Sequence, residues 1–284
     1  MPFLNNNNGE LKLNKNPYDI KLVAMDMDGT FARRDYTYDI PRFKEIMTRM
    51  KDNDCQFVVA SGNQYYQLRS LFPGYYNELS FVAENGAFVK DREDMLFSAD
   101  ISRDAIVATL ELLKKYPEVK NVMCGLESAY CEIGTVSDEF FELTNKYYYR
   151  LKWVDDFSLV NDKILKFAPT VPEEKTEDYC ELFRNELEGL LIPTSSGHGS
   201  VDLIAPNCHK ASGLERLVQR WGINPKQCIA FGDGNNDLEM ISYCGRGYAM
   251  ENAPDNVKKA ADYICPSNDE DGVLVILDQL FPKN

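Results

Sequence analysis

Short apolar runs alternate with amphipathic stretches over the first part of the chain. Continuous apolar runs are typical of strands buried on both faces, whereas apolar residues spaced three and four apart are typical of a helix that covers a core. The expected strands are residues 20–25, 56–60 and 80–88, and the expected helices between them are residues 41–53 and 64–72. The order β-α-β-α-β predicts a parallel sheet with right-handed crossovers.

The pattern changes between residues 90 and 205. The segments there are longer and more aromatic, and their faces are mixed rather than fully apolar. Such faces are typical of an antiparallel sheet with one covered face. The expected helices are residues 102–116 and 175–190, and the expected strands are residues 121–133, 164–171 and 200–206. We therefore expect a second domain of α+β type, inserted into the first.

The earlier pattern returns from about residue 207. An apolar strand that begins at Gln227 runs into carboxylates, and a short strand follows at residues 247–250. The expected helices are residues 210–222, 236–243, 254–261 and 272–280. The fold class predicted from these patterns is α/β. It consists of a Rossmann-like parallel-sheet core (residues 20–87 and 207–284), an inserted α+β domain (residues 88–206) and a mobile N-terminal tail (residues 1–19).

Charge and hydropathy narrow the classes of function. The chain has 284 residues and a formal net charge of −14, which argues against binding to nucleic-acid backbones or anionic membranes. A small anionic substrate in a local positive pocket remains compatible with that charge. No apolar run approaches the roughly 20 residues that span a bilayer, and the N-terminus lacks the order of a signal peptide. We expect a cytoplasmic protein.

Cysteines and histidines exclude two kinds of site. The eight cysteines are scattered, none forms a CxxC pair, and there are only two histidines. Zinc-site spacing is therefore absent, and a disulfide framework is not expected in a chain of this length.

Carboxylates follow two of the expected strands at the point where each strand ends. Asp26 and Asp28 end the first strand, and Asp233 and Asp237 follow the strand that begins at Gln227. The carboxyl ends of parallel strands lie along one edge of a sheet, so these side chains can meet at one site. Oxygen ligands without histidine favour a hard cation, most simply Mg²⁺.

Two other interpretations of the carboxylates fit the sequence less well. A calcium-binding loop needs Gly at its sixth position and Glu at its twelfth, but counting from Asp26 gives Phe31 and Thr37. Counting from Asp233 gives Leu238 and Cys244. Helix N-capping could apply in part to Asp237, but it does not explain two acids beside one strand end.

The remaining polar motifs are suited to binding a phosphate group. Ser61-Gly62-Asn63 follows a strand and opens a helix, so a hydroxyl and free backbone N–H groups form an anion cradle there. Lys210 can supply a point charge, although a lone lysine is most often solvated surface. The order of these pieces along the chain is more specific than any one of them.

These motifs resemble a known family. The segments DMDGTF, ASGN, the lysine at 210 and GDGNND are similar to the four motifs of the haloacid dehalogenase superfamily. The insertion after the third strand resembles the large cap of its Cof-type, class IIB members. FVVASGNQYYQL, FVAENGA, CGLESAY and VDLIAPNCHKASG resemble bacterial Cof-type sugar phosphatases from about residue 20 onward. Two positions depart from the wider pattern: Asn63, where Arg is common, and Phe31, where Leu is usual.

The resemblance implies a catalytic role for each motif. Asp26 would be the nucleophile that forms an aspartyl-phosphate, and Asp28 would protonate the leaving alcohol and then activate water. Mg²⁺ would be held by the carboxylates of Asp26 and Asp233 and by the backbone carbonyl of Asp28. Asn236 and Asp237 would hold the metal's waters and Lys210. The expected phosphate- or substrate-binding residues are Ser61, Gly62, Asn63, Asn85, Gly86 and Asn236.

The inserted domain would act as a cap that contacts the leaving group. Asn85-Gly86 would lie at its hinge, although Asn-Gly also marks ordinary turns. The polar candidates in the cap are Glu127, Ser128, Lys166 and His198, each of which has a plain surface interpretation. Tyrosines 130, 147, 148 and 149 could stack on a sugar, although packing is their default role.

The function expected from the sequence is a Mg²⁺-dependent phosphatase of small phosphorylated metabolites, most simply sugar phosphates. A phosphomutase is the first alternative, because an aspartyl-phosphate can return its phosphoryl group to a second hydroxyl. A sensor that binds a phospho-sugar without turnover is another, but a binder needs neither Asp26 nor Asp28.

Overall fold

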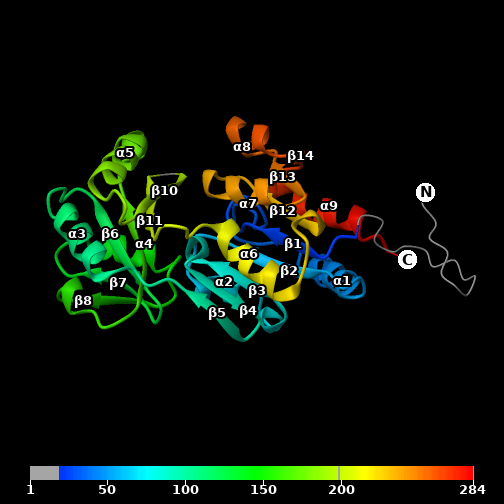
Figure 1. The fold of residues 1–284 in the computed structure, drawn as a ribbon, viewed down its shortest axis with the longest axis horizontal. Helices are drawn as coiled ribbons and strands as arrows, with labels where there is room; N and C mark the ends of the chain where they lie inside the picture. The colour runs from blue at the N-terminus through cyan, green and yellow to red at the C-terminus, as the bar shows by residue number, and fades with distance from the viewer. Residues whose placement is uncertain (1–18, 198, 284) are drawn as a thin grey trace, which may run out of the picture.

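The computed structural model describes residues 19–197 and 199–283. The tail expected at residues 1–19 lies outside this part of the chain except for its last residue, and His198 lies outside it as well. Figure 1 shows two lobes, each built around one sheet. No helix in the described ranges is long and apolar enough to cross a membrane.

The first lobe contains an eight-stranded sheet in the order β14-β13-β12-β1-β2-β3-β4-β5. The strands from β14 to β3 are parallel, and β4 and β5 are antiparallel additions at one edge. Its strands are β1 (Leu22–Met25), β2 (Gln56–Ala60), β3 (Ser80–Ala83), β4 (Phe88–Asp91), β5 (Asp94–Ser98), β12 (Cys228–Gly232), β13 (Arg246–Met250) and β14 (Tyr263–Cys265). The parallel sheet predicted from the sequence is confirmed.

Helices cover both faces of this sheet. Alternate residues of β1 and β2 face opposite cores, one shared with α1, α2 and α9 and the other with α6 and α7. This two-sided burial explains why β1 is apolar at every position and β2 at every position after Gln56. The helices are α1 (Ile40–Lys51), α2 (Tyr65–Ser70), α6 (Lys210–Trp221), α7 (Leu238–Tyr243), α8 (Asp255–Ala260) and α9 (Gly272–Leu280).

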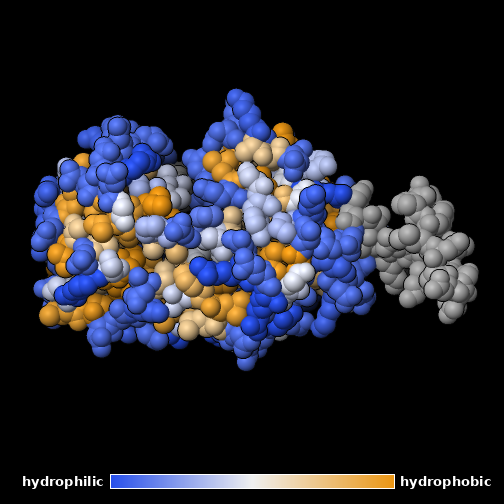
Figure 2. Space-filling model, in the orientation of Figure 1, coloured by the Kyte–Doolittle hydropathy of each residue, from blue (hydrophilic) through white to orange (hydrophobic). Residues whose placement is uncertain are grey.

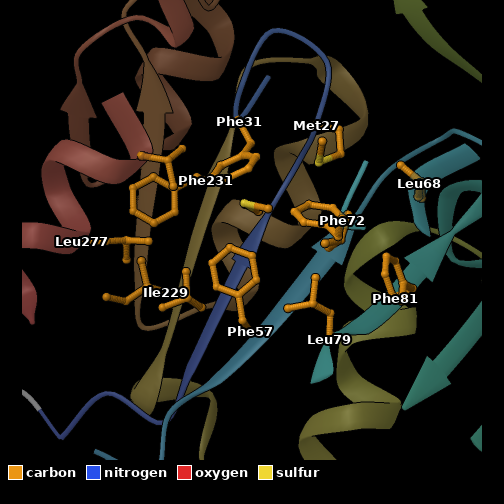
Figure 3. Packing of buried hydrophobic residues seen from close by; sticks show 14 of the residues in the cluster. Met27, Phe31, Phe57, Leu68, Phe72, Leu79, Phe81, Ile229, Phe231 and Leu277 are labelled. Atoms are coloured by element: carbon orange, nitrogen blue, oxygen red, sulfur yellow. The ribbon is translucent and has the colours of Figure 1, made fainter. Parts of the chain in front are cut away.

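Phe31 belongs to the first of these cores. It is buried, and its ring centroid lies 4.8 Å from that of Tyr38 and 5.4 Å from that of Phe43. Figure 3 shows Phe31, Phe72 and Phe231 in the same cluster, and the ring centroids of Phe31 and Phe72 lie 6.1 Å apart. The aromatic residue at this position therefore fills the core beneath the loop that follows β1.

The second lobe contains a six-stranded sheet in the order β10-β11-β9-β6-β7-β8. Its pairs are antiparallel except β7 with β8. Helices α3 and α5 pack on one face, and Phe140 and Phe141 of α4 pack with a smaller cluster. The elements are α3 (Arg103–Leu113), β6 (Lys120–Gly125), β7 (Ala129–Glu132), α4 (Asp138–Thr144), β8 (Leu151–Val154), β9 (Ile164–Thr170), α5 (Thr176–Glu186), β10 (Ile192–Gly197) and β11 (Ser200–Ile204).

Several predicted bounds differ from those of the structure, in ways that affect which sheet or turn a segment belongs to. The strand expected at residues 80–88 ends at Ala83, because the next three residues (η2, Glu84–Gly86) have positive φ angles that an extended strand cannot hold. Strands β4 and β5 pair within the eight-stranded sheet, so the boundary predicted at residue 88 cuts through that sheet. The strand expected at residues 121–133 is two strands, joined by a turn in which the Gly125 amide donates to the Ser128 carbonyl.

The surface in Figure 2 is largely hydrophilic, and the cysteines form no disulfide bonds. Figure 2 shows hydrophilic side chains over much of both lobes, with hydrophobic ones in smaller groups between them. All eight cysteines are buried and unpaired, as expected for a chain without a disulfide framework.

Candidate active site

Two neighbouring parallel strands bring the carboxylates of Asp26, Asp233 and Asp237 together. Strand β1 pairs with β12 in parallel, and the Asp26 amide donates to the Phe231 carbonyl at 3.0 Å just beyond the strand end. One carboxylate oxygen each from Asp26, Asp233 and Asp237 lies within 4.8 Å of the others. Residues about two hundred positions apart in sequence therefore meet at one sheet edge, where the parallel pattern predicts them.

Lys210 is the buried cation of this cluster. It is the first residue of α6, and its Nζ donates to Asp26 Oδ1 at 2.6 Å and to Asp237 Oδ1 at 2.7 Å. Only 1% of Lys210 is exposed, so the usual solvated position of a lysine does not apply. Burial opposes its charge, but the carboxylates of Asp237 and Asp26 hold the pKa of the ammonium above its ordinary value.

Both carboxylate oxygens of Asp237 accept hydrogen bonds, which hold the loop that follows β12. Its Oδ1 accepts from Lys210, and its Oδ2 accepts from the backbone amides of Asp233 and Gly234 at 3.0 and 2.9 Å. A Cβ added to Gly232 would lie 2.4 Å from the Asp237 Cβ, so only glycine lets the strand end pass this side chain. The arrangement agrees with a supporting role for Asp237 and leaves the other carboxylates for a cation.

Asp26 and Asp233 have the chemistry of a cation site. Burial, followed by the neighbouring carboxylates, raises the pKa of Asp26 well above its ordinary value despite Lys210. Burial and Asp237 likewise raise the pKa of Asp233 to about 6, although Thr30 Oγ1 donates to it at 2.7 Å. Burial and mutual repulsion therefore make the charged forms of these two carboxylates less favourable than those of free aspartate. Oxygen donors that need one more positive charge fit a hard divalent metal such as Mg²⁺.

Asn63 contacts Asp28 rather than an open anion cradle. Its Nδ2 donates to Asp28 Oδ2 at 2.6 Å. Burial raises the pKa of Asp28, while the Asn63 hydrogen bond opposes that rise. The side chain predicted to bind phosphate therefore orients the carboxyl predicted to act as acid and base. This contact could not be predicted from the motif, because it depends on how two loops meet.

The turn Ser61-Gly62-Asn63 rests on the residues after β3. Ser61 Oγ accepts from the Asn63 amide at 3.1 Å, and the Ser61 carbonyl accepts from the Asn85 amide at 3.1 Å. The Asn63 carbonyl accepts from the Glu84 amide at 3.2 Å. Ser61 is buried, and it lines the cavity described below.

Asn85 and Gly86 lie outside the cavity lining and support the residues that form the site. Asn85 Nδ2 donates to Asp202 Oδ2 at 2.5 Å, and Asn85 Oδ1 accepts from Asn236 Nδ2 at 3.1 Å. Gly86 has φ +88°, and a Cβ there would lie 2.2 Å from the His209 carbonyl oxygen. Both residues are buried outside the cavity lining, so their geometry fits a support for the turn and for α6 better than substrate contact.

A cavity of about 500 Å³ lies between the two sheets, over these carboxylates. Asp28 and Asp233 line it from the first lobe, and Phe140, Tyr147 and Tyr148 line it from the second. The lining residues are Asp26, Asp28, Tyr36, Ser61, Gly62, Asn63, Val122, Phe140, Leu143, Thr144, Tyr147, Tyr148, Lys166, Ala168, Thr170, Ser200, Asp202, Asp233, Gly234 and Asn236.

The predicted cap residues fall in different places. Lys166 is buried and lines the cavity, which the surface interpretation did not anticipate. Glu127 is exposed and Ser128 is buried, and both amides donate to Asp162 in a loop outside the cavity lining. Asp202 was not among the predicted site residues. A single carboxylate within an otherwise apolar strand segment was the signal that could have found it.

A second hollow, of about 660 Å³, lies elsewhere in the first lobe, between α1 and the segments around β2 and β3. It is larger, but its lining includes none of the clustered carboxylates. Size alone does not identify the site, and the chemistry favours the cavity between the sheets.

Comparisons with known proteins show the family to which the chain belongs. A family model of haloacid dehalogenase-like hydrolases matches residues 23–277. The Escherichia coli (strain K12) protein 5-amino-6-(5-phospho-D-ribitylamino)uracil phosphatase YbjI is 41% identical over 261 residues, covering 92% of this chain and 96% of its own. A solved structure from Streptococcus mutans UA159 has a TM-score of 0.89 at 35% identity, covering 93% of this chain and 100% of its own.

A more distant structure shows the same fold. The sugar phosphatase BT4131, of HAD subclass IIB, has a TM-score of 0.74 at 19% identity and covers 91% of this chain and 98% of its own. The family match spans most of the chain and includes both strand ends that carry the carboxylates. The chain therefore belongs to the haloacid dehalogenase-like hydrolases and is a phosphoric monoester hydrolase with a subclass IIB fold.

Proposed function

We propose that the protein is a Mg²⁺-dependent phosphatase that transfers the phosphoryl group of a small metabolite first to Asp26 and then to water. The observation that carries the proposal is the buried Asp26–Lys210 pair, 2.6 Å apart, in which Asp26 lines the cavity. A carboxylate beside a fixed cation can approach a phosphate dianion that would otherwise repel it. Asp28 lies two residues further on and lines the same cavity.

The proposed reaction has two steps. A carboxylate oxygen of Asp26 attacks phosphorus, the bond from phosphorus to the ester oxygen breaks, and the Asp28 carboxyl gives its proton to the leaving alkoxide. Asp28, now a carboxylate, then takes a proton from a water molecule, whose oxygen attacks phosphorus. The bond from phosphorus to Asp26 breaks, and inorganic phosphate leaves.

Other residues of the chain would bind the phosphoryl group and the metal. Ser61 and the Gly62 amide would donate to the phosphoryl oxygens, and Lys210 would offset negative charge. Asp26, Asp233 and the Asp28 carbonyl would hold Mg²⁺. When bound, the metal supplies Lewis-acid stabilisation of the charge on the phosphoryl oxygens.

We also propose that the second lobe is a cap that selects the leaving group. The volume of the cavity lies in the range typical of pockets for small metabolites, and Phe140, Tyr147 and Tyr148 line it from the second lobe. Aromatic faces suit a flat ring or the apolar face of a sugar. We therefore propose a phosphorylated sugar or polyol as substrate. A polyol phosphate that carries a heterocycle, the kind of compound named for the Escherichia coli relative, would use more of this aromatic lining.

The test is a substrate panel with released phosphate as the readout, run with Mg²⁺ and with Asp26→Asn as the blank. Esters of sugars, of simple polyols and of 5-amino-6-(D-ribitylamino)uracil form the panel. We expect phosphate release from several esters, most rapidly from the ring-bearing polyol ester. Movement of the phosphoryl group along one sugar without free phosphate would indicate a mutase. Binding without turnover of any ester would indicate a sensor.

A further inference from the structure

Lys166 on β9 is a second buried ammonium, separate from the Asp26 cluster. Only 1% of this residue is exposed. Its Nζ donates to the Gly62 carbonyl at 2.7 Å and to Asp202 Oδ2 at 3.0 Å, and it lies 3.2 Å from Glu84 Oε2. The ammonium therefore has three oxygen partners in the interior of the protein.

The partners of Lys166 come from both lobes. Asp202 lies on β11, which pairs with β9 in the six-stranded sheet, whereas Gly62 and Glu84 follow β2 and β3 of the eight-stranded sheet. The lysine thus joins the cap to the phosphate-binding turn. Its neighbour Asn85 extends the contact, because it donates to Asp202 and accepts from Asn236.

The orientation of the Gly62 carbonyl affects other groups of that turn. It belongs to the peptide group that also carries the Asn63 amide, and that amide donates to Ser61 Oγ. A hydrogen bond to one end of a planar peptide fixes the direction of the other end. The Asn63 side chain in turn donates to Asp28, so the same peptide group connects the phosphate cradle to the acid–base carboxyl.

Packing leaves the turn little freedom to adjust. A Cβ built on Gly62 would lie 3.2 Å from Asn85 Nδ2 and 3.4 Å from Asp202 Oδ2. A buried ion cluster is often no more stabilising than apolar residues of similar volume. A role in catalysis therefore explains this cluster better than fold stability alone does.

We propose that Lys166 is a positioning residue, which holds the Gly62 carbonyl and, through the Asn63 amide of the same peptide group, keeps Ser61 Oγ facing the phosphoryl group when the cap is seated. The inference rests on the proposed phosphatase function of the same site. It requires that the cap organises phosphate binding as well as selecting the leaving group. Lys166 then acts on every phosphate ester, whatever alcohol the ester carries.

The experiment compares Lys166→Met with the wild type and with Lys163→Met as a matched control. Lys163 is a nearby lysine whose Nζ donates to Ser98 Oγ of β5, away from the phosphate-binding turn. The readouts are kinetics with acetyl phosphate and with ribitol 5-phosphate, the inhibition constant of inorganic phosphate, and the rise in Tm that phosphate produces with Mg²⁺.

For Lys166→Met we expect KM for both esters and the inhibition constant for phosphate to rise by about tenfold or more, in similar ratio, with a smaller fall in kcat. The rise in Tm produced by phosphate should shrink in the same variant. Lys163→Met should behave like the wild type. A loss confined to ribitol 5-phosphate would make Lys166 a leaving-group contact and overturn the proposal, and so would unchanged phosphate binding.

The Lys166→Met change leaves two buried carboxylates without their cation and can prevent folding. The double variant Lys166→Met/Asp202→Asn removes one of those charges and should fold, yet keep the weakened phosphate binding. Recovery of normal phosphate binding in the double variant would overturn the proposal. If the wild type released phosphate from no ester, the proposed function would fail, while the Tm measurement with phosphate would still test the role of Lys166.

Discussion

At the scale of single residues, the site depends on buried charges that compensate one another. Lys210 lies between Asp26 and Asp237, so removal of either acid still leaves the ammonium one carboxylate partner. Removal of the lysine would instead leave two acids buried without it, which is the more damaging change. This asymmetry makes Asp26 the better residue for a functional test.

Asp26→Asn should abolish turnover without unfolding the protein. The amide keeps the shape and lets Asp237 retain Lys210, but it is a poor nucleophile and a weaker metal ligand. We expect steady-state phosphate release to fall by at least about a hundredfold, as loss of covalent catalysis implies. Circular dichroism and Tm provide the folding control. Activity above about a hundredth of the wild type would remove Asp26 from the nucleophile role.

Divalent metal should affect both activity and stability. Burial and carboxylate repulsion raise the pKa values of Asp26 and Asp233, so a cation bound between them should offset that cost in the folded state. We expect Mg²⁺ to raise the Tm of the wild type but not of Asp233→Asn, and chelation to stop phosphate release. Ca²⁺ should inhibit, because it takes more oxygens at longer distances. Full activity in excess chelator would contradict a metal site.

At the scale of elements, the segment η2 positions the site by an unusual backbone path. Glu84, Asn85 and Gly86 all have positive φ, and this turn supports both the Ser61-Gly62-Asn63 turn and the start of α6. Residues 80–88 were predicted as one strand, although Glu84-Asn85-Gly86 interrupts the apolar run there. The Asn-Gly pair was a local signal of the turn.

Gly86→Ala should destabilise the protein more than an ordinary glycine replacement. A Cβ at Gly86 would lie 2.2 Å from the His209 carbonyl oxygen, so α6 or η2 must shift. Gly189 is the control, because it has φ +75° and a Cβ added there would meet no atom within 4 Å. We expect about 2 kcal/mol or more for Gly86→Ala and about 1 kcal/mol for Gly189→Ala in urea unfolding. Equal costs would mean that the close contact relaxes freely.

The sequence predicted which side chains lie at the ends of strands better than it predicted which strands pair with one another. The acids after β1 and β12 could be assigned to one edge because parallel strands share a direction. Strands β4 and β5 could not be assigned to a sheet, because a short hairpin can extend either sheet with the same pattern. Strand β14 has only three residues, too few for a periodic signal.

At the scale of the whole molecule, the cap and the core should divide specificity from chemistry. Tyr147 lines the cavity from the cap, and Tyr36 of the core donates to its hydroxyl at 3.3 Å. Which cap residues line the cavity depends on how the lobes dock, and no local pattern encodes that. Glu127 was therefore a reasonable candidate from sequence that the structure leaves outside the cavity lining, whereas Asp202 was missed.

Tyr147→Ala should change the substrate preference while leaving the chemistry intact. We expect kcat/KM for the ring-bearing polyol phosphate to fall by about tenfold or more, because a stacking surface is lost. Hydrolysis of acetyl phosphate should stay within about tenfold, equivalent to ~1.4 kcal/mol. Glu127→Ala is the matched control and should change neither rate. If Tyr147→Ala stopped acetyl phosphate hydrolysis as completely as Asp26→Asn, the cap would supply a catalytic group.

The most direct measurement is to trap the phosphorylated enzyme and locate the phosphoryl group. Asp28→Asn should slow the attack of water on the intermediate, whereas an aryl phosphate, with its good leaving group, should still phosphorylate the enzyme. After mixing with Mg²⁺ and aryl phosphate, acid quench and peptide mass mapping should find one phosphoryl group on Asp26. Single-turnover release of phosphate with no modified Asp26, or a phosphoryl group on another residue, would contradict the aspartyl-phosphate mechanism.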